Sequence, residues 1–268
     1  MPGDSVFDRF KGYGFIHHRA LNAPAAFAEG LRLATVHPDR THILEGDLCW
    51  DFSGANRLLY FRHPSYVVDT LAPAAVRDGL ERRTIVGLDM LEAIKQTGAC
   101  LVIELKVGRG DAEAALRHLI AHMEANFAGR YWIDGFSLTM LHFVKQTSPA
   151  TPVTLHTECV SGGRALVGAP EWPPARIRRI DDLDFVDGIA IRRRGSEAFM
   201  ARAAADVRSA GKTLIMSRLH TLRHFECSRD WGVRAGYMHW DFEDLIAFND
   251  RLEGKPDIGA RAQPSRAS

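Results

Sequence analysis

The chain has 268 residues, of which 46% are hydrophobic and 25% charged. This balance is typical of folded globular proteins and excludes disordered and collagen-like chains. Lys and Arg total 34 against 33 Asp and Glu, so the basic excess of a duplex-binding protein is missing and we expect no nucleic-acid partner. The four cysteines form no CxxC pair, which argues against a zinc ribbon.

Two further absences bear on location. No apolar run is long enough to span a membrane, so we expect no transmembrane segment. Segment 1–11 carries Asp4 and Asp8 and lacks the apolar core of a secretory signal. We therefore expect a cytoplasmic protein with free thiols.

Short apolar segments alternate with helical patterns along the chain. We expect strands, in chain order, at 14–16, 41–49, 58–62, 100–105, 132–138, 152–157, 185–191, 213–216 and 237–240. We expect helices at 23–33, 88–96, 112–127, 139–146, 197–210, 222–229 and 242–252. Asp111 is placed to cap the third helix, and Gly211 to end the fifth. Segment 161–174, which holds three Pro and three Gly, is expected to form a loop.

The alternation amounts to roughly eight strand–helix units in about 240 residues, the number and length of a closed (β/α)8 barrel. No Pro/Ser-rich linker separates two halves, so we predict a single-domain α/β TIM barrel over 1–254 and a flexible tail over 255–268. An open doubly wound sheet is the alternative. It is disfavoured because no GxGxxG turn follows the first strand.

Carboxylates lie on two of the predicted strands, near the ends where barrel enzymes place their active sites. Glu45 and Asp47 are two residues apart on the second strand, and Glu104 lies on the strand over 100–105. Because residues i and i+2 of a strand face the same side, all three side chains should converge inside the barrel mouth. Three carboxylates suit one hard divalent cation, Mg²⁺ or Ca²⁺.

Histidines and basic residues end neighbouring strands. His18 and His63 are placed to act as general acid and base, in an order that the sequence leaves open. Arg19 and Lys106 supply positive charge for an anionic group such as a phosphate. His17 alternates with His18, so we expect its side chain to pack on the opposite face of the strand.

These residues together resemble the glycerophosphodiester phosphodiesterase family, which includes related phospholipase D-type barrel enzymes. The matching motifs are His18-Arg19-Ala20, Glu45-Gly46-Asp47, His63 and Glu104-Leu105-Lys106. The resemblance implies cleavage of a small-molecule or lysolipid phosphodiester by histidine acid–base catalysis, with one divalent ion held by Glu45, Asp47 and Glu104. It also implies a small insertion after the second-strand hairpin, at 65–83, which would lie over the site.

The chain departs from the family pattern in several places. Ala20 replaces a glycine, Pro64 replaces an aspartate, and segment 215–218 reads Ile-Met-Ser-Arg where the family has a Trp-Thr segment. The pocket beyond the phosphate is therefore expected to differ from that of a housekeeping glycerophosphodiesterase. The residues proposed for this pocket are His156, Glu158 and Trp240.

Three alternatives stay open on the sequence. A phosphodiester lyase would use the same site and release a cyclic phosphate. A metal-dependent sugar isomerase or epimerase would instead bind its ion through His156, Glu158, His239 and Asp241. A non-catalytic barrel would bind phosphodiesters without turnover. The oligomeric state is not indicated by any motif.

Overall fold

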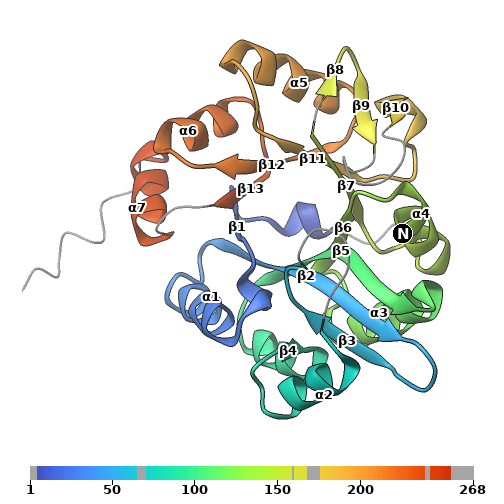
Figure 1. Ribbon diagram of the computed structural model, residues 1–268. Helices are drawn as coiled ribbons and strands as arrows, with labels where there is room; N and C mark the ends of the chain where they lie inside the picture. The colour runs from blue at the N-terminus through green and yellow to red at the C-terminus, as the bar shows by residue number, and fades with distance from the viewer. Residues whose placement is uncertain (1–4, 65–70, 159, 168–175, 239–241, 255–268) are drawn as a thin grey trace, which may run out of the picture.

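The computed structural model describes residues 5–64, 71–158, 160–167, 176–238 and 242–254. Eight parallel strands follow one another in the order β1-β13-β12-β11-β7-β6-β5-β2, and pairing of β1 with β2 closes the ring (Figure 1). The strands are β1 (Gly14–His17), β2 (Thr41–Phe52), β5 (Cys100–Gly110), β6 (Tyr131–Gly135), β7 (Val153–Thr157), β11 (Gly188–Arg192), β12 (Thr213–Leu219) and β13 (Ala235–Met238). The predicted (β/α)8 barrel is confirmed.

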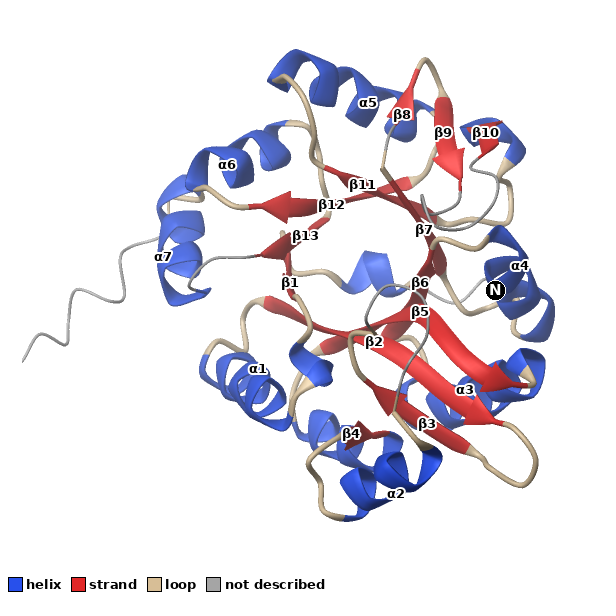
Figure 2. Cartoon of the chain, viewed as in Figure 1, coloured by secondary structure: helices blue, strands red, loops and turns tan. Residues whose placement is uncertain are grey.

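Helices surround the ring of strands, as Figure 2 shows. They are α1 (Pro24–Val36), α3 (Ala112–Phe127), α4 (Leu138–Thr147), α5 (Glu197–Ser209), α6 (Leu222–Asp230) and α7 (Phe242–Leu252). The predicted caps are in place: the Asp111 side chain accepts a hydrogen bond from the Ala114 amide at 2.9 Å, and Gly211 has a φ of 68° after α5. The helix boundaries are therefore fixed by local sequence.

The barrel interior is filled by alternate residues of the strands. Its core includes Ile16, Ile43, Val102, Trp132, Ala190, Ile215, Ala235 and Tyr237. Val6 and Phe7 of the short turn η1 (Val6–Arg9) join this cluster, with Phe10 directly after it. This dark-blue turn lies behind the ring in Figure 1. The aromatic side chains therefore close the amino-terminal end of the barrel, and the polar groups that follow the strands lie at the other end.

The second strand continues into a hairpin. β2 pairs antiparallel with β3 (Leu58–Phe61), which in turn pairs with β4 (Val86–Gly87). The connection between β3 and β4 carries α2 (Pro73–Glu81), a helix that the sequence reading did not predict. Of the expected insertion over 65–83, residues 65–70 lie outside the described part of the chain.

Several predicted elements differ from the structure in type or in bounds; the strand predicted over 185–191, for example, begins only at Gly188. Segment η3 (Leu88–Gln96) is a 3-10 helix instead of an α-helix. The reason is its spacing, because Leu88, Leu91 and Ile94 are three residues apart and a helix of three residues per turn puts them on one face. The strand predicted over 132–138 ends early, at Gly135, because Ser137 caps α4 by accepting from the Met140 amide.

The prediction of a loop over 161–174 is wrong for its first half, where Ser161 and Arg164–Val167 belong to strands. β8 (Val160–Ser161), β9 (Arg164–Val167) and β10 (Arg176–Arg179) form a small antiparallel sheet. Gly162 and Gly163 both have positive φ, which a two-residue hairpin turn requires, and this Gly-Gly signal was available in the sequence. The sheet lies outside the barrel beside α5 in Figure 1, where the Gly163 amide donates to Asp206.

Three remaining sequence predictions concern membrane spans, the cysteines and the tail. No helix of the described residues has the length and apolar character that crossing a bilayer demands. Cys49, Cys100 and Cys227 are buried and form no disulfide within the described residues, and Cys159 lies outside them. The predicted tail, 255–268, also lies outside them.

Candidate functional site

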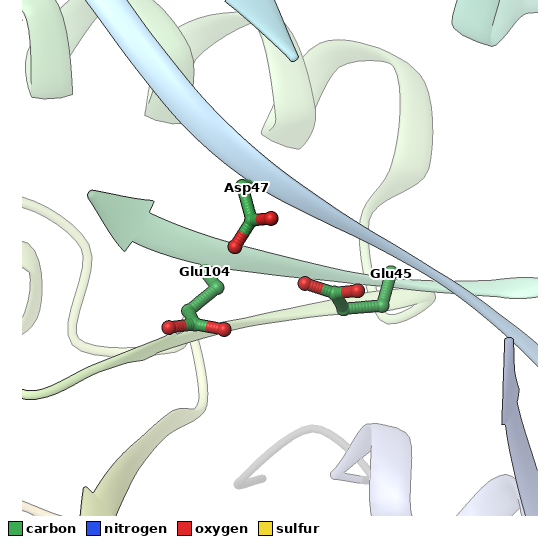
Figure 3. A group of neighbouring side chains, drawn as sticks. All are labelled: Glu45, Asp47 and Glu104. Carbon is green, nitrogen blue, oxygen red and sulfur yellow. The ribbon is translucent and has the colours of Figure 1, made fainter. Parts of the chain in front are cut away.

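Three carboxylates meet inside the barrel mouth. Glu45 and Asp47 come from β2 and Glu104 from β5, and Asp47 is the direct register partner of Glu104. One oxygen of each lies within 4.8 Å of the others, and the side chains point toward one another in Figure 3. All three residues are buried, with exposed fractions of 0%, 1% and 4%. The structure thus brings together the three residues predicted as metal ligands.

The cluster is electrostatically unbalanced. Burial, followed by the charges of Asp47 and Glu104, raises the pKa of Glu45 well above its usual value. Burial also raises the pKa of Glu104, although the Lys106 cation opposes the shift. A divalent cation placed among these oxygens would stabilise the ionised form of both Glu45 and Glu104.

Asp47 behaves differently because it is surrounded by donors. Burial acts to raise its pKa, but the hydrogen bond of His63 and the charge and hydrogen bond of Lys106 hold the pKa below the usual range. Lys106 Nζ lies 2.9 Å from Asp47 Oδ1 and also contacts Glu104. Asn22, which sequence reasoning missed, donates to Asp47 and accepts from its amide at 2.9 Å. Asp47 is therefore ionised and fixed in orientation.

Glu45 has one bonded and one orphaned oxygen. Its Oε2 accepts from the backbone amide of Arg19, while its Oε1 is buried and has no hydrogen-bond partner. Arg19 presents that amide because it adopts a left-handed conformation, with a φ of 61°, at the start of the turn η2 (Ala20–Asn22). A buried carboxylate oxygen without a partner is costly. The orphaned atom and the three hard oxygen donors fit a divalent ion.

His63 follows the hairpin and reaches back to the carboxylates. Its Nδ1 lies 2.9 Å from Asp47 Oδ2, and its Nε2 lies 2.9 Å from Arg19 Nη2. An ionised carboxylate only accepts and a guanidinium only donates, so we assign the proton of the neutral ring to Nδ1. The side chain is 37% exposed and Arg19 is 46% exposed, so both groups are accessible from solvent.

The two adjacent histidines at the end of β1, His17 and His18, point in opposite directions. His18 is partly buried at the barrel mouth, with its ring edge-on to Tyr237 at 5.8 Å between centroids. His17 is buried on the outer side, where its Nε2 lies 2.9 Å from Nδ1 of His42. Burial and the neighbouring His42 lower the pKa of His17 well below its usual value. This geometry follows the alternation expected from the sequence.

A second polar group, which the sequence did not single out as a unit, lies next to the carboxylates. Asp134 of β6 accepts from the Tyr237 hydroxyl at 2.6 Å, and its Oδ2 lies 3.4 Å from His156 Nδ1. Burial acts to lower the pKa of His156, but the Asp134 charge outweighs it and raises the pKa. The His156 ring stacks on Phe136 at 4.8 Å, and Lys106 Nζ lies 5.6 Å from the Phe136 centroid. His156 thus lines the mouth beside Lys106.

The remaining pocket candidates have different positions. Glu158, after β7, forms ion pairs with Arg192 and Arg194. Trp240 lies outside the described residues, as do His239 and Asp241. Among the residues that are described, the acidic trio of β2 and β5 is the one cluster with metal-ligand spacing. The ion set of the isomerase alternative gains no support, because guanidinium groups already hold Glu158.

Comparison with other proteins gives a consistent picture. No family profile and no curated protein sequence matches the chain. Among solved structures, a provisionally assigned glycerophosphoryl diester phosphodiesterase from Silicibacter pomeroyi has a TM-score of 0.63 and 13% identity, over 92% of this chain and 98% of its own. A glycerophosphodiester phosphodiesterase from Parabacteroides distasonis has a TM-score of 0.62 and 14% identity, over 90% and 98%.

A third structure contains a small molecule. It is a phosphodiesterase from Oleispira antarctica in complex with the product sn-glycerol-3-phosphate, with a TM-score of 0.59 and 18% identity, over 87% of this chain and 95% of its own. At such low identities the likeness establishes the fold. The chain has the (β/α)8 barrel fold of the glycerophosphodiester phosphodiesterase structures, over nearly its whole length.

Proposed function

We propose that this protein is a metal-dependent phosphodiesterase that cleaves a glycerophosphodiester or a related phosphodiester. The observation that carries the proposal is the buried trio Glu45, Asp47 and Glu104, with Lys106 in direct contact with two of its members. A structural metal site would not need a lysine inside it, whereas a site that also binds a phosphate would. The solved structures of the same fold include phosphodiesterases, one of them with sn-glycerol-3-phosphate.

The three carboxylates would hold one divalent ion, Mg²⁺ or Ca²⁺. When bound, such an ion polarises phosphoryl oxygens and offsets the charge that develops in the transition state. The carboxylates would orient it, and Asn22 and the Arg19 amide would keep Asp47 and Glu45 in place.

Arg19 and Lys106 would bind the phosphate. The charges of Glu104 and Asp47 outweigh burial and raise the pKa of Lys106, so its ammonium group stays charged. The Arg19 side chain is the more exposed of the two and now contacts His63. A bound phosphate would attract this guanidinium as a bidentate partner and free Nε2 of His63.

The histidines would move the protons. Because the neutral ring of His63 carries its proton on Nδ1 and keeps a lone pair on Nε2, His63 suits the general base that accepts a proton from the attacking oxygen. His18, directly after β1, would then protonate the leaving alkoxide. If the attacking oxygen is a hydroxyl of the substrate itself, the first product is a cyclic phosphate, which either is hydrolysed or leaves.

The test is a panel of phosphodiesters assayed with Mg²⁺, Ca²⁺, Mn²⁺ or EDTA, with products identified by phosphorus NMR. We expect a phosphomonoester to form with a divalent ion and no turnover in EDTA. A cyclic phosphate as end product would indicate the lyase reaction instead. Binding without turnover under every condition would refute the catalytic proposal. The cytoplasmic location and the use of a lysolipid substrate stay predictions from the sequence.

A further inference from the structure

Strand β12 contains a bulge near the end that faces the site. Met216 pairs with Gly236 of β13, but the next pair is Leu219 with Met238. Ser217 and Arg218 therefore both lie opposite Tyr237, two residues against one. Arg218 has a φ of 64°, a left-handed conformation that side-chain-bearing residues rarely adopt.

The bulge determines where Arg218 projects. Tyr237 belongs to the inner core of the barrel, whereas Met216 and Leu219 belong to the outer layer under the helices. In a regular strand Ser217 would face inward and Arg218 outward. With the extra residue, both positions fall on the stretch of strand opposite the inward-facing Tyr237. This register places Arg218 on the stretch of β12 that faces the barrel mouth, in a conformation that costs backbone strain.

Arg218 is exposed and has no electrostatic partner in the described chain. It takes part in none of the ion pairs or hydrogen bonds found among residues 5–64, 71–158, 160–167, 176–238 and 242–254. Exposed arginines are common, but one held at the mouth by a backbone irregularity differs from one on a helix surface. Strain is retained where the surrounding structure or a ligand compensates for it.

The charges of the mouth are divided between its two sides. The carboxylate trio belongs to β2 and β5. Across the ring, β7, β11 and β12 are consecutive neighbours (Figure 2). Among the described residues at or just after their carboxyl ends are four arginines, Arg192, Arg193, Arg194 and Arg218, and one carboxylate, Glu158. Glu158 pairs with Arg192 and Arg194, and the charge of Arg193 acts on Glu197 of α5. Arg218 has no ion pair within the described residues.

The two sides are joined by a continuous row of side chains. Lys106 lies over the ring of Phe136, which stacks on His156. His156 Nε2 in turn lies 3.4 Å from the Oγ atom of Ser217, and Ser217 directly precedes Arg218. A ligand with its phosphate at Lys106 would extend along this row toward β12.

We propose that Arg218 forms a second anion-binding subsite, and that the preferred substrates are phosphodiesters whose alcohol group carries its own carboxylate or phosphate. The proposal rests on the proposed function, because it takes the phosphate position from Lys106 and the metal cluster. Arg218 is a specificity-determining residue in it and takes no part in bond cleavage. A guanidinium without an ion pair among the described residues, placed at the mouth by the bulge, favours an anionic substituent over a neutral or cationic one.

The test uses two substrates that differ by one carboxylate, glycerophosphoserine and glycerophosphoethanolamine. A second pair, glycerophosphoglycerol with and without a terminal phosphate, separates a phosphate from a carboxylate as the preferred anion. We expect the wild type to favour the anionic member of at least one pair by about tenfold in kcat/KM, mostly through KM. Arg218→Gln should bring that ratio close to one, and Arg218→Lys should restore part of it.

The matched control is Arg202→Gln, which removes an exposed arginine from the outer surface of α5 and should keep the wild-type ratio. A binding measurement separates this proposal from the proposed function. Isothermal titration with phosphoserine and phosphoethanolamine should give the same preference for the anionic ligand in the wild type, and its loss in Arg218→Gln, even if no diester is cleaved.

Two results would overturn the subsite. One is equal affinity and equal kcat/KM for the members of each pair in the wild type. The other is a preference that survives Arg218→Gln while the melting temperature falls, which would assign Arg218 to the stability of the bulge. Absence of cleavage of all diesters, with the binding preference intact, would refute the phosphodiesterase proposal alone.

Discussion

The buried histidine pair under α1 makes the stability of this barrel depend on acid. Burial, followed by the charge of His37, lowers the pKa of His42 from 6.5 to about 4, and the pKa of its partner His17 is lowered too. A proton therefore binds the unfolded chain more readily than the folded one. The stabilisation is complete above pH 6.5 and is lost progressively as the pH falls toward 4.

The magnitude follows from the two pKa values of His42. Between pH 7 and pH 5 the unfolding equilibrium constant rises roughly twentyfold through this group alone, a loss of about 2 kcal/mol in the free energy of unfolding. His17 contributes with the same sign. Glu45 and Glu104 contribute with the opposite sign, because their pKa values are raised in the folded chain and protonation favours the fold.

The assay compares variants so that the carboxylate contribution cancels. Urea unfolding in EDTA is measured at pH 7 and pH 5 for the wild type and for His42→Phe, with His42→Gln as a second variant. Loss of the hydrogen bond to His17 lowers stability at both pH values. The wild type loses free energy of unfolding between pH 7 and pH 5 through His42. We expect the change in the free energy of unfolding between these pH values to lack this loss of about 2 kcal/mol in the variants.

The control is His142→Gln, because His142 is exposed on α4 and its replacement should leave the pH difference unchanged. An identical pH difference in wild type and both His42 variants would refute the reasoning. It would mean that the imidazole of His42 is solvated, or charged, in the folded protein.

Three further predictions concern the site. Removal of divalent ions with EDTA should abolish phosphodiester cleavage, and Glu45→Gln should weaken ion binding in a calorimetric titration; full activity after exhaustive dialysis against EDTA would contradict the metal assignment. His63→Ala and His18→Ala should each lower kcat by about 10² to 10⁴, and His17→Ala should lower it far less. With a p-nitrophenyl diester, whose leaving group needs no proton, His18→Ala should regain activity while His63→Ala should not. The reverse pattern would exchange the roles of the two histidines. Lys106→Met should keep ion affinity but lose cleavage and competitive inhibition by inorganic phosphate; normal kcat/KM in the folded fraction, with a lower melting temperature, would limit Lys106 to a structural role.

The strand–helix alternation was determined by the sequence alone. The apolar run over 100–105 and the capped helix over 112–127 are examples of local signals. Each is contained in a short stretch of the sequence and needs no knowledge of distant residues. Eight such units close into a barrel because each strand must bury both faces. Two-residue alternation within a strand also determined that Glu45 and Asp47 share a face and that His17 and His18 do not.

The tertiary structure decided what depends on register between strands and on the paths of loops. The contacts of His63 with Asp47 and of Asp134 with Tyr237 join residues far apart in the chain, and no local pattern specifies them. The position of Arg218 opposite Tyr237 depends on a single extra residue in β12 relative to β13. Sequence periodicity alone would place its side chain on the outer face, because a bulge shifts the alternation and becomes visible only when two strands are paired.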